Sequence, residues 1–168
     1  MIRKKVCMLG SFAVGKTSLV QRFGSSKFPR KYQTTVGVMI DKKTVEIGDQ
    51  EVYLMLWDIY GQDAFRRVQT SYLADASSYF LVVDGTRKDT LDMALALRKR
   101  VNKEIGEVPF VLILNKADLK DEWEISRQDL DELSKSGSAV VETSAKTGEG
   151  VEKAFLSLTA KMLKVQTG

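Results

Sequence analysis

One stretch of the sequence decides the fold: Gly10-Ser11-Phe12-Ala13-Val14-Gly15-Lys16-Thr17. It matches the pattern GxxxxGK[ST], follows an apolar run at Val6 to Leu9 and opens a predicted helix from Lys16 to Phe23. Between a strand and a helix, such a loop lets backbone N–H groups converge on phosphate oxygens, and the helix N-terminus adds positive potential. We therefore expect a phosphate-binding loop and not a chance glycine-rich turn.

The residues of this loop have different expected roles. Lys16 is expected to reach the β- and γ-phosphates of a nucleotide, where it also serves catalysis, and Thr17 is expected to bind Mg²⁺ through its hydroxyl. The neighbouring residues expected to contact the nucleotide are Ala13, Val14, Gly15 and Ser18.

The rest of the chain alternates apolar runs with amphipathic helical segments. Strands are expected at Val38 to Ile47, Val52 to Trp57, Tyr79 to Val83, Phe110 to Leu114 and Ala139 to Val141. Helices are expected near Phe65 to Tyr72, from a Thr90 cap to about Ile105, from a Ser126 cap through Leu133, and at Val151 to Met162. This order predicts an α/β fold with a mainly parallel sheet, helices on both faces and ligands at the carboxyl ends of the strands.

Two finer expectations concern this fold. Gly48-Asp49 predicts a hairpin, so the strands on either side of it should be antiparallel. The inward face of the helix after Thr90 is expected to consist of Leu91, Ala94, Leu95, Val101 and Ile105.

A second motif, Asn115-Lys116-Ala117-Asp118, follows the strand Phe110 to Leu114 and indicates which base is bound. The Asp118 carboxylate can accept hydrogen bonds from N1–H and the exocyclic amino group of guanine. Adenine has no such donor pair at that edge and would leave the carboxylate unmatched. A lone NKxD is usually a polar turn, but after a valid phosphate loop it predicts guanine contacts by Asn115, Lys116 and Asp118.

The remaining motifs complete a nucleotide site. Asp58-Ile59-Tyr60-Gly61 fits DxxG: Asp58 is expected to hold Mg²⁺ through water, and the Gly61 amide to contact the γ-phosphate. Gln62 follows, placed to orient the attacking water. In Glu142-Thr143-Ser144-Ala145-Lys146, the Ala145 N–H can bond guanine O6, and Ser144 and Lys146 are expected beside the base. A hydroxyl of Thr34 or Thr35 can complete the Mg²⁺ shell when a γ-phosphate is present.

With these motifs in order, the sequence resembles the Ras superfamily, and the Rab branch most closely, across nearly all its 168 residues. The resemblance implies one G domain over residues 1–168, with a six-stranded sheet, one antiparallel edge strand and five helices. It also implies a GTP/GDP cycle with Mg²⁺. It assigns the Mg²⁺ role to Thr35, water positioning to Gln62, base packing to Phe28 and a phosphate lid to Tyr32. Phe28 as an ordinary core aromatic stays an alternative.

The resemblance further implies partners. Effectors, exchange factors and GTPase-activating proteins would bind switch I, around residues 29–38, and switch II, around residues 58–72. The sequence departs from the family pattern at two places, because Phe12 stands where most relatives carry Gly or another small residue and Ile59-Tyr60 replace the usual Thr-Ala. The rings of Phe12 and Tyr60 either obstruct hydrolysis and the approach of accelerator proteins, or they pack outward, and both interpretations stay open.

Composition limits the catalytic groups and the kinds of partner that this chain can have. The sequence has no histidine, so catalysis must use carboxylates, lysine, hydroxyls, amides or a bound cation. Cys7 lies in an apolar run and is expected to be a buried, inert thiol. The net charge of +4 is spread along the chain, which predicts no nucleic-acid partner. No lipid anchor is expected in this chain. We expect a cytoplasmic location, and a peripheral association with a membrane stays open.

Two functions are consistent with these features. The first is a molecular switch that hydrolyses GTP slowly and needs a partner's arginine for fast hydrolysis. The chain itself has Tyr32, and not an arginine, three residues before Thr35. The alternative is a nucleotide-gated binding module with negligible hydrolysis. A P-loop phosphotransferase fits poorly, because NKxD and ETSAK have no role in such an enzyme.

Overall fold

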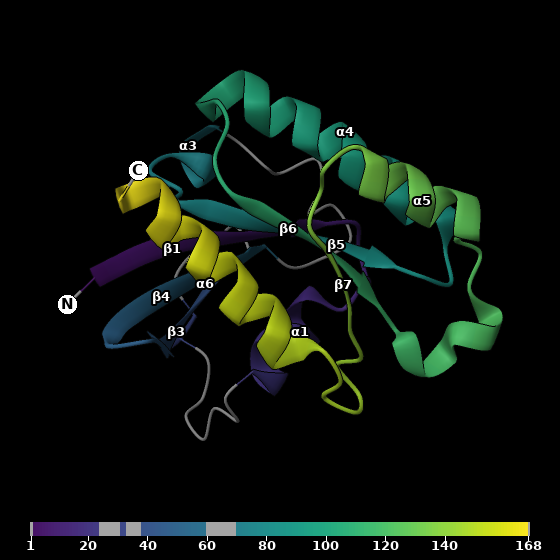
Figure 1. Ribbon diagram of the computed structural model, residues 1–168, viewed down its shortest axis with the longest axis horizontal. Coiled ribbons are helices and arrows are strands. Elements are labelled where there is room, and N and C mark those ends of the chain that lie inside the picture. The colour runs from purple at the N-terminus through teal and green to yellow at the C-terminus, as the bar shows by residue number, and fades with distance from the viewer. Residues whose placement is uncertain (1, 24–30, 33–37, 60–69, 168) are drawn as a thin grey trace.

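A computed structural model of the chain describes residues 2–23, 31–32, 38–59 and 70–167. The strands of this part form one sheet in the order β2-β3-β4-β1-β5-β6-β7 (Figure 1). Their bounds are β1 Ile2–Gly10, β2 Lys31–Tyr32, β3 Val38–Ile47, β4 Gln50–Ile59, β5 Ser78–Asp84, β6 Phe110–Asn115 and β7 Val140–Glu142.

The sheet is mainly parallel, as the sequence predicts. β1 pairs in parallel with β4 and β5, and β6 pairs in parallel with β5 and β7. β3 is antiparallel to β4, which confirms the hairpin at Gly48-Asp49. The fold class is therefore confirmed, and the two-residue β2, antiparallel to β3, extends the expected sheet at its edge.

Helices cover both faces of the sheet (Figure 1). In the described part they are α1 Lys16–Arg22, α3 Thr70–Leu73, α4 Lys88–Ile105, α5 Arg127–Lys135 and α6 Val151–Thr167, with the 3₁₀ helix η1 at Ala117–Glu122. Apolar side chains of α1 and α6 pack with one face of the sheet, and those of α3, α4 and α5 pack with the other. The phosphate loop and η1 both follow carboxyl ends of parallel strands, so the topology brings their motifs to one edge.

The central strand β1 shows how the sequence separates the two cores. Val6 and Met8 pack on the side of α1 and α6, whereas Cys7 and Leu9 pack on the side of α4. This alternation is the ordinary period of a strand that is buried on both faces. The Cys7 thiol is buried as expected, and this burial raises its pKa to about 12, which disfavours the reactive thiolate.

The start of α4 corrects a prediction. Thr90 is not the helix cap, because α4 begins at Lys88 with Arg87 at the cap position. The Thr90 hydroxyl is instead buried against the end of β5, where it accepts from the Asp84 N–H at 3.0 Å and donates to the Arg87 carbonyl at 2.7 Å. Ser126, in contrast, caps α5 as predicted, with a reciprocal capping box to Asp129.

The inward face of α4 also differs in part from the prediction. Leu91, Ala94 and Val101 are buried as expected, and Leu97, which the prediction omitted, is buried with them. Leu95 and Ile105 are only partly buried and pack at the margin of that core.

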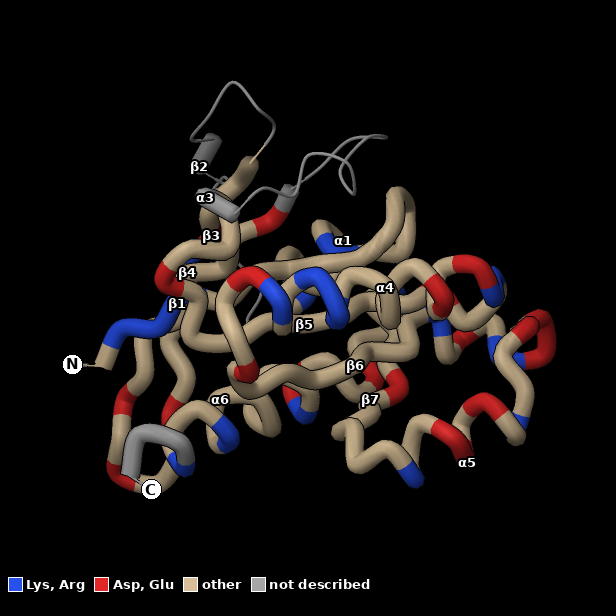
Figure 2. Tube along the Cα trace, turned by 90° about the horizontal axis from the view of Figure 1, so that it is seen from above, with Lys and Arg blue, Asp and Glu red and all other residues tan. Residues whose placement is uncertain are grey.

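Charged residues of both signs are distributed along the described chain (Figure 2). Lysine and arginine segments alternate with aspartate and glutamate segments along α4, α5 and the connecting loops (Figure 2). None of the helices in the described ranges is both long and apolar enough to cross a membrane.

Candidate functional site

The phosphate loop lies between β1 and α1, the strand and helix that the sequence predicts on either side of it. Gly15 has φ 103° and a Cβ there would lie 2.2 Å from Asn115 Nδ2, so both the conformation and the space require glycine. Ala13 also has a positive φ, of 62°. Ala13 is exposed and Val14 is buried in the core beneath the loop, while Ser18 is exposed in the first turn of α1.

Lys16 is buried inside this loop. Its Nζ donates to the Gly10 carbonyl at 2.9 Å and to the Ser11 carbonyl at 3.0 Å. Burial lowers the pKa of Lys16, and the nearby Asp58 carboxylate partly opposes that shift. The ammonium group is thus already held over the loop, on carbonyl groups that an anionic ligand can replace.

Thr17 and Asp58 come together at the start of α1. The Thr17 hydroxyl donates to Asp58 Oδ2 at 2.7 Å, although the two residues lie on α1 and β4. The register of β1 with β4 produces this contact, because Asp58 pairs with Met8 just before the loop begins. A hydroxyl and a carboxylate side by side are the hard oxygen ligands that Mg²⁺ prefers, so the pair fits the protein's share of such a shell.

Asn115 joins the base motif to the phosphate loop. Its Nδ2 donates to the Val14 carbonyl at 3.0 Å. Its Oδ1 accepts from the Thr143 hydroxyl at 2.9 Å and from the Ala145 N–H at 3.2 Å. The Ala145 amide, which the sequence assigns to guanine O6, is therefore directed at Asn115 in this structure, through a long hydrogen bond.

Asp118 and Ser144 face one another across the same edge. The Ser144 hydroxyl donates to Asp118 Oδ1 at 2.7 Å, and the same hydroxyl accepts from the Thr147 N–H at 3.1 Å. A carboxylate has about four lone-pair positions, so Asp118 retains acceptors for a ligand. Lys146 is exposed next to them.

Asp84 is a residue of this site that the sequence interpretation missed. It ends β5, is 1% exposed, and its Oδ2 lies 2.8 Å from Lys116 Nζ and 3.1 Å from Arg87 Nε. Burial alone would raise the Asp84 pKa, but hydrogen bonds from Lys116, Thr86 and Arg87 outweigh it and lower the pKa to about 2. The available signal was its position, since Asp84, Asp58 and Asn115 all lie at the ends of apolar strands.

Arg87 connects this carboxylate to the phosphate loop. Its Nη2 donates to the Phe12 carbonyl at 2.8 Å, while its Nε faces Asp84. The Phe12 ring itself is 48% exposed. Polar contacts therefore run from the phosphate loop through Arg87 and Asp84 to Lys116 of the base motif.

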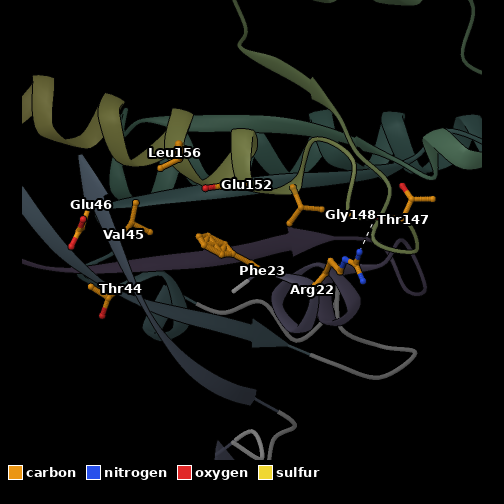
Figure 3. A pocket seen from close by; sticks show the side chains of 10 residues that line it. Arg22, Phe23, Thr44, Val45, Glu46, Thr147, Gly148, Glu152 and Leu156 are labelled. Carbon is orange, nitrogen blue, oxygen red and sulfur yellow. Dashed lines mark hydrogen bonds between the residues drawn. The ribbon is translucent and has the colours of Figure 1, made fainter. Parts of the chain in front are cut away.

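A groove of about 760 Å³ lies beside this site, between α1, β3 and α6 (Figure 3). Its described lining includes Thr147 and Gly148 of the loop between β7 and α6, residues 143–150, which we call the base loop. It includes no residue of the phosphate loop or of NKxD, so we do not assign the nucleotide to it. In the groove, the Arg22 guanidinium donates to the Thr147 carbonyl at 2.9 Å (Figure 3). Arg22, at the end of α1, thereby holds the loop that follows ETSAK.

Several predicted site residues fall outside the residues that the structure describes in full. The roles expected for them, in base packing, the phosphate lid, Mg²⁺ binding, γ-phosphate contact and water positioning, stay predictions. These residues are Phe28, Tyr32, Thr34, Thr35, Tyr60, Gly61 and Gln62.

Comparisons with known proteins agree with this arrangement of motifs. The profile of the Ras family matches residues 5–164. The Ras-related protein Rab-7L1 of Homo sapiens is 36% identical over 171 residues, which cover 97% of this chain and 84% of that protein. Rab-30 of Homo sapiens is 37% identical over 161 residues, covering 95% and 79%, and Rab-12 of Mus musculus is 36% identical over 163 residues, covering 95% and 67%. The chain therefore belongs to the Ras family and is a Rab-like small GTPase.

Proposed function

We propose that this protein is a molecular switch, one G domain over residues 1–168, that binds GTP and GDP with Mg²⁺ and slowly hydrolyses GTP to GDP. One contact carries the proposal: Asn115 Nδ2 donates to the Val14 carbonyl at 3.0 Å. This bond fixes the base motif against the phosphate loop, which sets the spacing between a guanine base and its phosphates. Two turns that matched these motifs by chance would not be expected to contact one another.

In this proposal, the phosphate end of the site, which consists of the phosphate loop and Asp58, binds and orients the triphosphate. Lys16 Nζ exchanges the Gly10 and Ser11 carbonyls for phosphate oxygens, and the loop amides of residues 13–18 surround the phosphates. Thr17, Thr35 and Asp58 would hold Mg²⁺, which neutralises charge that develops on the phosphates. Gln62 orients the attacking water, and Gly61 donates to the γ-phosphate.

The base end of the site, which consists of NKxD and ETSAK, provides specificity for guanine. Asp118 accepts from the two guanine donors, while Ser144 holds the carboxylate in place at 2.7 Å. Lys116, Phe28 and Lys146 flank the base plane, and the Ala145 N–H turns from Asn115 to guanine O6. Release of Thr35 and Gly61 after hydrolysis changes switches I and II, which effectors, exchange factors and accelerator proteins then distinguish.

We place the intrinsic hydrolysis at or below the slow rate of Ras proteins, roughly 10⁻⁴ s⁻¹. Catalysis of this kind depends on positioning, and a displacement of about 1 Å can reduce the rate about 100-fold. Phe12 and Tyr60 are bulky residues next to the expected path of water and of a partner's arginine. We place the protein in the cytoplasm, where it can associate with a membrane through its partners.

The base assignment is tested by Asp118→Asn. The amide keeps an oxygen for the Ser144 hydroxyl but replaces one acceptor with a donor, which suits the carbonyl at position 2 of xanthine. Competition binding should show that GDP affinity falls by about 2–4 kcal/mol and that preference moves toward XDP. Asp121→Asn, at an exposed aspartate on the same 3₁₀ helix, is the matched control and should bind as the unchanged protein does. Equal binding of ATP and GTP by the unchanged protein would show that the assignment is wrong.

A further inference from the structure

Trp123 packs directly behind the base motif. It follows η1, and its ring lies against the backbone of Gly85, the residue after β5. A Cβ at Gly85 would lie 2.1 Å from ring atom Cε2 of Trp123, closer than any side-chain carbon can approach. The ring therefore occupies space that only a glycine at position 85 leaves open.

The indole of Trp123 also holds the backbone of Lys116. Its Nε1 donates to the Lys116 carbonyl at 2.9 Å. Lys116 has φ 74° and ψ 40°, a left-handed conformation that costs free energy in a residue with a side chain and persists only when surrounding contacts enforce it. The indole N–H is one such contact, because it fixes the direction of the peptide that follows Lys116.

The same tryptophan supports the partner of the Lys116 side chain. Lys116 Nζ is paired with Asp84 Oδ2 at 2.8 Å, and Asp84 directly precedes Gly85. The Gly85 backbone is held on both sides, because its N–H donates to the Asn115 carbonyl at 3.1 Å and its carbonyl accepts from the Glu124 N–H at 2.9 Å. Trp123 thus sits where the end of β5, the base motif and the chain after η1 meet.

We propose that Trp123 is a positioning residue for the base end of the site, and that it sets how long a guanine nucleotide stays bound. It acts through the Lys116 peptide and through Gly85, and it would not touch the nucleotide. The inference rests on the proposed function, because it assigns Lys116 to the base. The indole contacts described above are all at the base end, so loss of Trp123 should speed nucleotide release without changing the hydrolysis of GTP that is already bound.

The first test compares two substitutions at this position. Trp123→Phe keeps an aromatic ring over Gly85 but removes the donor to Lys116, and it should speed release of a fluorescent GDP analogue by roughly threefold. Trp123→Ala removes ring and donor, and it should speed release by roughly tenfold or more. Single-turnover hydrolysis of bound GTP should match the unchanged protein in both variants, which a general loss of structure would not allow.

Trp57→Phe is the matched control, because the Trp57 indole N–H makes no hydrogen bond among the described residues. It removes the same N–H group from a residue of strand β4 and should leave the release rate unchanged. Release that is accelerated equally in Trp57→Phe and in Trp123→Phe, relative to the unchanged protein, would overturn the inference. So would unchanged release in Trp123→Phe, the variant least expected to disturb folding.

A double-mutant cycle tests the contact between the ring and the glycine. Gly85→Ala places a methyl group in the ring and should speed release by roughly tenfold, because the indole must move. In a Trp123→Ala background the methyl group meets no ring, so the second substitution should add little. Additive effects would contradict the inference. Failure of the unchanged protein to bind GDP would overturn the proposed function as well, whereas GDP binding with unaltered release would overturn the inference alone.

Discussion

The phosphate end and the base end of the site differ in how their polar groups are engaged. At the phosphate end, Lys16 is held by carbonyls of its own loop, and the Thr17 hydroxyl is held by Asp58. At the base end, the Asn115 side chain bonds to three residues in two other segments of the chain, namely Val14 in the phosphate loop and Thr143 and Ala145 after β7. The phosphate end must therefore exchange partners when a nucleotide binds, while most of the base end is already arranged. A switch needs this difference, because its anchor must stay constant while its phosphate sensor changes.

The largest expected effect comes from removing the central cation of the phosphate end. Lys16→Ala should weaken GDP binding by roughly 100-fold or more, because it removes charged hydrogen bonds to phosphate oxygens. Calorimetric titration with GDP and with guanosine separates the two ends, since guanosine has no phosphate and should bind both proteins alike. An equal loss of affinity for both ligands would mean that the two ends are not independent.

Thr17→Asn is expected to have the next largest effect and to separate the two nucleotides. It should weaken GTP binding about tenfold more than GDP binding, because the triphosphate depends more on the bridging cation. The measurement is equilibrium affinity for each nucleotide in Mg²⁺ and in EDTA, and the difference between the two proteins should disappear in EDTA. If the unchanged protein binds GTP equally in both solutions, the metal assignment is wrong.

Asp84 gives the base end a pH dependence. Its folded-state pKa of about 2 lies below the ordinary value of 3.8, so its contribution to stability is complete above pH 4 and is lost as the pH falls toward 2. After an allowance for solvent screening, that contribution is about 1–2 kcal/mol. Denaturant unfolding of the unchanged protein and of Asp84→Asn at several pH values should show a stability difference that shrinks across this range. Parallel pH curves would contradict the role given to the Asp84–Lys116 pair.

Arg22→Gln should have the smallest effect. The Arg22 bond to the Thr147 carbonyl is exposed and holds only the outer part of the base loop, so GDP release should become about two- to threefold faster. Arg100→Gln is the control, because the Arg100 guanidinium lies on α4 and pairs with Glu104 of the same helix. A similar acceleration in the control would remove any special role of Arg22.

Much of the fold could be predicted because its strands are apolar and its motifs follow them directly. Tyr79 to Val83 and Phe110 to Leu114 predict buried strands, and each proves to be one or two residues longer. The added residues, Ser78, Asp84 and Asn115, are polar, so an apolar pattern could not include them. β1 is longer for a similar reason, since Lys5 places its Nζ 3.9 Å from the centre of the Trp57 ring while its backbone stays in the strand.

The part of the site that sequence could not predict depends on contacts between distant segments. Thr90 has the residue type of a helix cap, but its hydroxyl is used by Asp84 at the end of another element. Trp123 has no recognisable motif, and only the folded chain shows that its ring fills the space above Gly85. Residue type and spacing identify groups that contact a ligand, whereas the residues that hold those groups are identified by packing.

Single-turnover hydrolysis of GTP with and without Mg²⁺, with ATP in parallel, tests the account most directly. The protein should retain guanine nucleotide through purification and convert bound GTP to GDP at roughly 10⁻⁴ s⁻¹ or more slowly in Mg²⁺. In EDTA the conversion should stop, and ATP should be neither retained nor hydrolysed. Hydrolysis of ATP as readily as GTP, or hydrolysis that is independent of Mg²⁺, would contradict the account of a guanine-nucleotide switch.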